Sequence, residues 1–184
     1  MNDVINTTFD PFNDRIARDI RNSLSSALVS DLSADKGEKI DQVVLNWGQQ
    51  RLLPLYQDYI RQTRERYRQV EVDIKSARIE DPRFQALVLW NAGLFFELHE
   101  LLETIWHGTQ GIERTGLKGL IQAAGVYVHR QRENIDAASG LAQRARQNLL
   151  AGKDHLNFIA NLAQLIECLA DPSQPPPRLD SLER

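Results

Sequence analysis

The chain has 184 residues, of which 42% are hydrophobic and 26% are charged, and its formal net charge is −3. This length and composition are typical of a folded globular protein and exclude a chain too polar to bury a core. The slight acidity argues against a protein that neutralises nucleic-acid phosphates, so we expect no nucleic-acid partner. No apolar stretch reaches the roughly 18 residues of a membrane span, so we expect no membrane partner either.

Cysteine usage and the first residues indicate the compartment. Cys168 is the single cysteine, which excludes an intrachain disulfide and indicates a reducing environment. Residues 1–6 show no basic segment followed by an apolar one, so we expect no secretory signal. Together these features predict a cytoplasmic protein.

Helical periodicity dominates the first 80 residues. Over 12–32 an apolar side chain returns every four positions, and Asp10-Pro11 supplies an N-cap and a first-turn proline, so we expect a helix to begin there. A second helical pattern covers 40–53. Pro54 then predicts a kink or a new helix, and the pattern continues over 55–74.

The second part of the chain contains its most apolar stretch, 84–106, which opens with the start signal Asp81-Pro82. Within it, Asn91-Ala92-Gly93 is a candidate break between two helices, because glycine is a poor interior residue. The glycines of 108–116 predict a loop. Further helices are expected over 117–132, 134–152 and 154–170.

The tail and the overall pattern complete the fold prediction. The tail, 172–184, contains three consecutive prolines, so we expect it to be extended and loosely held. No stretch keeps the two-residue alternation of a strand for long. We therefore predict a single-domain all-α bundle of about six helices, in which helices of 1–80 pack on a core formed by 81–171.

Two polar residues fall inside the apolar stripe of the helix expected around residue 100. On a wheel of about 100° per residue, His99 and Glu103 lie close to Trp106, whereas Glu97 and Glu100 lie on the arc that can face water. Burying a polar side chain without a hydrogen-bond partner is costly, so we expect His99 and Glu103 to have partners in the core.

The following helix offers such partners. A polar stripe runs along it at spacings of three and four residues, formed by Lys118, Gln122, Gly125, His129 and Glu133. If the two helices pack antiparallel, His99, Glu103, Gln122 and His129 converge in one buried polar cluster.

At these positions the chain resembles a known family. His99, Glu103 and Trp106 form His-x-x-x-Glu-x-x-Trp, the signature of the family called domain of unknown function 309. The wider similarity covers about residues 88–150 and includes the stretches 93–100 and 119–124, His129 and Asn134. The resemblance implies an all-α fold and no particular reaction. Glu133 departs from the glycine expected before Asn134, which concerns the turn at that point.

Three interpretations of the cluster stay open. In the first it is a structural hub: His99 donates to Glu103, the Trp106 indole finds an acceptor, and the network sets how the helices register. In the second, the cluster binds a small ligand through His99, Glu103, Trp106, Gln122 and His129, or a metal ion through His99, Glu103 and His129. Two imidazoles and one carboxylate suit zinc or non-haem iron, in an enzyme or a sensor. In the third, the residues act as a metal-free general base pair.

No complete catalytic signature accompanies the cluster, so no catalytic residue is assigned. Residues 99–103 read His-Glu-x-x-Glu and lack the second histidine of the zinc proteases. The arginines of 61–68 are diluted by Glu65, Glu71 and Asp73 and fall on several sides of a helix, so we interpret this stretch as a solvated face or as part of a homo-oligomer contact.

Overall fold

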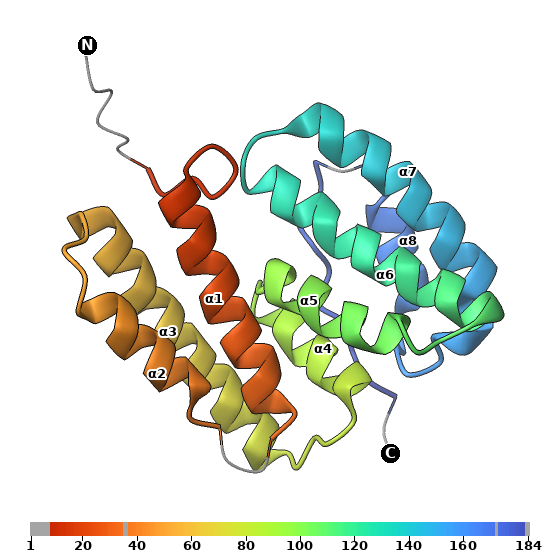
Figure 1. Ribbon diagram of the computed structural model, residues 1–184. Coiled ribbons are helices and arrows are strands. Elements are labelled where there is room, and N and C mark those ends of the chain that lie inside the picture. The colour runs from red at the N-terminus through yellow and green to blue at the C-terminus, as the bar shows by residue number, and fades with distance from the viewer. Residues whose placement is uncertain (1–7, 35–36, 172, 183–184) are drawn as a thin grey trace. The chain divides into compact units, whose positions relative to one another are not determined.

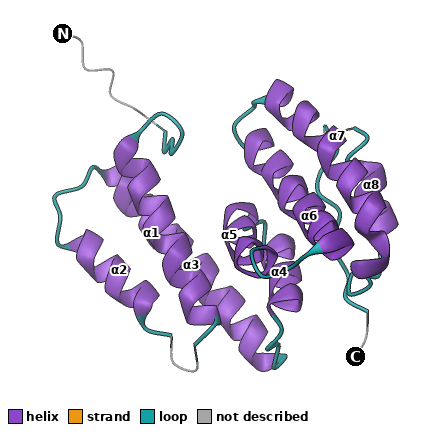
Figure 2. Cartoon of the chain, turned by 45° about the vertical axis from the view of Figure 1, so that its right-hand side comes forward, coloured by secondary structure: helices purple, strands orange, loops and turns teal. Residues whose placement is uncertain are grey.

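Figure 1 shows the computed structural model of the chain, which describes residues 8–34, 37–171 and 173–182. Residues 1–6, where we expected no secretory signal, and Pro172 lie outside this range. The described residues form eight α-helices and one 3-10 helix, with an isolated bridge in place of any strand (Figure 2). The all-α class is confirmed, with eight helices where we expected about six. No helix in the described ranges has both the length and the apolar character needed to cross a membrane.

The chain divides into two compact units, Met1–Asp73 and Ile74–Arg184. The first three helices are α1 (Arg15–Leu32), α2 (Lys39–Gly48) and α3 (Pro54–Ser76). The first helix begins later than Asp10-Pro11 suggested, because Asp14 is its N-cap and accepts hydrogen bonds from two backbone amides of the first turn. Asp10 instead closes a preceding turn by accepting from the Phe12 amide. Pro54 starts a new helix, one of the two outcomes expected for it.

The second unit contains α4 (Pro82–Asn91), α5 (Phe95–Trp106), α6 (Gly111–Arg130), α7 (Ile135–Gly152), a 3-10 helix (Lys153–His155) and α8 (Leu162–Cys168). Asp81 caps α4, in agreement with its start signal, and Asn134 caps α7. The loop expected over 108–116 is shorter, because α6 already begins at Gly111. The helix expected over 154–170 is interrupted, because the chain between the 3-10 helix and α8 turns to form a bridge between Ile159 and Ser181.

A tight turn divides the apolar stretch 84–106 into α4 and α5. Gly93 has a φ of +68°, which side-chain-bearing residues rarely adopt. Its N–H donates to the Trp90 carbonyl and the Leu94 N–H to the Leu89 carbonyl, at 2.9 Å each. These paired hydrogen bonds define a Schellman motif, so the candidate break at Gly93 is confirmed.

Within the second unit, α6 lies between α5 and α7 (Figure 1). The α6 and α7 backbones touch at glycines. A Cβ on Gly152 would lie 2.3 Å from the Gly116 Cα, and a Cβ on Gly119 would lie 2.7 Å from the Leu149 amide nitrogen. Non-bonded heavy atoms do not approach so closely, so the contact requires glycine at these positions.

The described part of the tail, residues 173–182, is extended as expected but is held firmly. The Trp90 indole N–H donates to the Pro177 carbonyl at 2.7 Å. The Asn91 side chain exchanges two hydrogen bonds of 2.8 Å with the Leu179 backbone. The expectation of a loosely held tail is therefore wrong for these residues, because α4 supplies partners for its backbone.

The turn between α6 and α7 repeats the Schellman pattern without glycine. Glu133 has a φ of +56°, and its N–H donates to the Arg130 carbonyl at 2.9 Å. The Asn134 N–H donates to the His129 carbonyl at 3.1 Å. The turn therefore has a standard geometry, although Glu133 stands where glycine was expected. Glu133 adopts a left-handed conformation there, which is energetically unfavourable for a residue with a side chain.

Exchanging glycines within α7 tests the helix contact. Gly152→Ala is expected to lower the free energy of unfolding by about 3 kcal/mol, because the added methyl group forces α6 and α7 apart. Gly140→Ala is the matched control: its Cβ would meet no atom within 4 Å, so it should raise that free energy by about 0.5–1 kcal/mol. Urea denaturation measures both. A Gly152→Ala protein as stable as the parent would contradict the contact.

Glycine at position 133 tests the strain in the second turn. Glu133→Gly should raise the free energy of unfolding by about 1 kcal/mol, because glycine adopts a positive φ without steric cost. Gln131→Gly, at a φ of −58° in the same turn, should lower it by up to about 1 kcal/mol. Thermal denaturation of the two variants provides the comparison, and equal effects would rule out a conformational cause.

Candidate functional site

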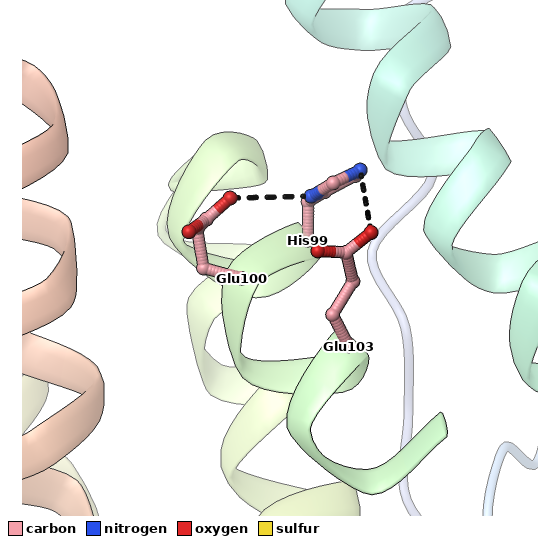
Figure 3. A group of neighbouring side chains, drawn as sticks. All are labelled: His99, Glu100 and Glu103. Atoms are coloured by element: carbon pink, nitrogen blue, oxygen red, sulfur yellow. Dashed lines mark ion pairs between the residues drawn. The ribbon is translucent and has the colours of Figure 1, made fainter. Parts of the chain in front are cut away.

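The candidate site lies in the middle of α5, where one imidazole stands between two carboxylates (Figure 3). The His99 Nδ1 atom is 3.5 Å from a Glu100 carboxylate oxygen. The His99 Nε2 atom is 3.8 Å from a Glu103 carboxylate oxygen. Each ring nitrogen therefore faces one acid, and the pairing of His99 with Glu103 expected from their one-turn spacing is observed.

The three side chains together offer a set of metal-ligand atoms. One ligand atom each from His99, Glu100 and Glu103 can be chosen so that all lie within 4.8 Å of one another. Zinc binds imidazole nitrogen and carboxylate oxygen at about 2.0–2.2 Å, so small side-chain rotations would bring these atoms around one ion. The His99 Nδ1 atom is buried and makes no hydrogen bond in the described part of the chain, because the 3.5 Å approach of Glu100 is an ion-pair contact only.

The site is half-exposed, which corrects the expectation of a buried cluster. The side chains of His99, Glu100 and Glu103 are 33%, 35% and 43% exposed. The two carboxylates can therefore exchange water and ions with solvent, whereas the Nδ1 atom of His99 is buried. They do not need the enclosed network of partners that full burial would demand.

The core-facing side of α5 explains this exposure. It is centred about 100° around the helix from His99 and is formed by the fully buried Leu98, Leu101 and Leu102. The sequence interpretation placed the centre nearer His99 because it counted Trp106 as a core residue, whereas the Trp106 side chain is only half-buried. The same rotation buries Glu97, which is 5% exposed although we expected it to face water.

Trp106 stabilises the connection between α5 and α6 through a hydrogen bond and a ring contact. Its indole N–H donates to the Arg114 carbonyl at 3.1 Å. The Arg114 guanidinium lies 3.7 Å from the centre of the indole ring and donates to the Thr109 carbonyl at 3.1 Å. Trp106 thus finds the acceptor that the structural interpretation expected, at the helix connection.

Gln122 and His129 lie on α6. The Gln122 side-chain oxygen accepts a hydrogen bond of 2.7 Å from Asn148, so this amide is directed at α7. His129 lies in the last turn of α6, where its carbonyl accepts from Arg132 and Asn134. The described group of ligand atoms within 4.8 Å comprises neither residue.

Glu100 is the site residue that sequence reasoning missed. Residues adjacent in sequence on a helix point about 100° apart, so Glu100 was assigned to the solvent side and not to His99. The length of the glutamate side chain bridges that angle. A search for acids next to a half-exposed histidine, as well as one turn away, would have found it.

The family comparison concerns this part of the chain. Residues 84–141 match the family described as Domain of unknown function (DUF309). The DUF309 match covers α4, α5, α6 and the first turns of α7, so the expected resemblance is confirmed for this segment. Comparison with curated proteins and with solved structures gave no match.

Two substitutions separate the hydrogen bond of Trp106 from its ring contact. Trp106→Phe should lower the free energy of unfolding by about 1 kcal/mol, because the bond to the Arg114 carbonyl is lost while a ring stays under the guanidinium. Trp106→Ala should lower it by about 2–3 kcal/mol, because the ring is lost as well. Chemical denaturation of both variants gives the values. Equal losses would show that the ring contact contributes nothing.

Proposed function

We propose that the DUF309 segment binds one divalent transition-metal ion, zinc or iron(II), through His99, Glu100 and Glu103. The observation that supports this proposal is the convergence of one imidazole and two carboxylates, with ligand atoms within 4.8 Å, on a single turn of α5. Imidazole nitrogen and carboxylate oxygen form a ligand set that suits both ions.

Charge favours a cation at this position. With a neutral imidazole, which is the form that binds metals, the three side chains carry a charge of −2, which one divalent ion neutralises. A purely structural role explains the cluster less well, because ion pairs between half-exposed side chains contribute little to stability.

Exposure favours an open site. Three protein ligands on the surface of one helix leave coordination positions for water or a small ligand, as in metal sites that catalyse or sense. In this metal-dependent enzyme or sensor, His99 and Glu103 are ligands, as the sequence interpretation expected. The third ligand is Glu100 in place of His129.

Metal content and thermal stability test the proposal. Protein purified without a histidine tag should contain, or take up from zinc or iron(II), about one ion per chain. An ion at 100 times its dissociation constant should add about 2.7 kcal/mol to the free energy of unfolding, because it binds the folded state alone. His99→Ala and Glu103→Gln should abolish both effects. Elemental analysis and melting curves with added ion measure them.

His155→Ala is the matched control, because His155 is an exposed histidine of the 3-10 helix and should leave metal binding unchanged. His129→Ala decides the ligand set: unchanged affinity supports Glu100 as third ligand, and reduced affinity restores His129. A protein whose melting temperature ignores zinc, iron and manganese would refute metal binding. A loss of stability in metal-free His99→Ala would then support the structural hub.

A further inference from the structure

The first unit contains a cavity of about 530 Å³ at the junction of α2 and α3. Small-molecule sites in proteins have volumes of about 300–1,000 Å³. One side of the cavity is apolar and is formed by Val44, Trp47, Leu52 and Ile60. This site lies outside the DUF309 segment and uses none of the metal-site residues.

The indole of Trp47 is held in place at the apolar side. Its N–H donates to the Ser23 hydroxyl of α1 at 2.8 Å. The hydrogen bond fixes the orientation of the ring and leaves its flat face available to a ligand. Because the ring is already ordered, little side-chain entropy of Trp47 is lost when a ligand packs against it.

The cationic edge of the cavity belongs to α3. Arg61, Arg64 and Arg68 line the cavity and follow one another at spacings of three and four residues on α3, which places them on one face of the helix. Glu65 is the one acidic residue among the described lining residues. The lining residues by themselves carry a net charge of +2, from three arginines and one glutamate, and the other acids that pair with Arg61 and Arg64 lie outside the lining.

Arg64 is the fixed member of this edge. Its guanidinium donates to Asp41 at 2.8 Å and to Glu71 at 2.9 Å, and its side chain is 17% exposed. Burial lowers the pKa of Arg64, but the hydrogen bonds to Glu71 and Asp41 outweigh burial, so the pKa is raised overall. The guanidinium is thereby kept charged and oriented.

Arg61 and Arg68 are the exchangeable members. Their partners are Asp58 at 3.0 Å and Glu65 at 3.2 Å, and all four side chains are mostly exposed. Such exposed pairs contribute little, so an incoming anion can replace the acid as a partner of either arginine at small cost.

We propose that this cavity binds a small amphipathic organic anion, with an aliphatic or aromatic body against Trp47 and a carboxylate against Arg61 and Arg68. The occupant follows from the combination of an apolar side with a cationic edge in a cavity of small-molecule size. It replaces the interpretation of residues 61–68 as a merely solvated face.

Titration with decanoate tests the site in the full-length protein. Isothermal calorimetry should show saturable binding of one decanoate per chain, with decanol and decylammonium at least ten times weaker because they lack the anion. In ¹H–¹⁵N spectra, the indole signal assigned through Trp47→Phe should shift, while those of Trp90 and Trp106 should not. Equal binding of decanol, or a shift confined to the other two indoles, would overturn the proposal.

Charge variants distinguish the loss of the anion site from a loss of the fold. Arg61→Gln with Arg68→Gln should weaken decanoate binding about tenfold, which corresponds to the loss of about 1.4 kcal/mol. Glu65→Gln should strengthen it about threefold, a gain that a damaged fold cannot produce. The control pair Arg15→Gln with Arg144→Gln removes the same charge from exposed residues that do not line the cavity and should change nothing. Weaker binding by Glu65→Gln, or an equal loss in the control pair, would refute the anion site.

Discussion

The contact between the α6 and α7 backbones at Gly116, Gly119 and Gly152 is the constraint on which the second unit depends. With no side chains between them, the two helices approach closely along one side of α6. The helix α6 also packs against α5, whose Leu98, Leu101 and Leu102 are fully buried. The face of α5 that carries these leucines is covered by its neighbours, and the turn that carries His99 is left half-exposed.

This half-exposure decides which chemistry the His99 turn can support. A buried histidine between two acids would be a network of fixed partners, costly to break and closed to ligands. At the surface the same three groups pair only loosely, at 3.5 and 3.8 Å, and solvent reaches them. Trp106 makes its contacts at the connection between α5 and α6, where it donates to the Arg114 carbonyl, so its role is separate from that of the His99 turn.

The sequence predicted features that depend on neighbouring residues, such as helix ends. It did not predict features that depend on contacts between distant parts of the chain. Asp81, Asn134 and Pro54 mark helix ends through their own backbone and side-chain chemistry, and the structure agrees at each. The rotation of α5 depends on its packing against neighbouring helices, which no single-helix wheel contains, and this is why the burial of Glu97 was not predicted. The docking of Leu179 on Asn91 joins residues 88 positions apart, beyond any periodicity.

The two candidate sites offer different chemical groups, and this difference separates their ligands. The His99 turn presents an imidazole and two carboxylates, which suit a metal cation, whereas the α3 edge presents guanidinium groups, which suit an organic anion. The family match at 84–141 includes the first site and excludes the second. A metal function would therefore belong to the DUF309 segment, and an organic-anion function to the helices that precede it. The chain combines these two chemistries without requiring that one site influence the other.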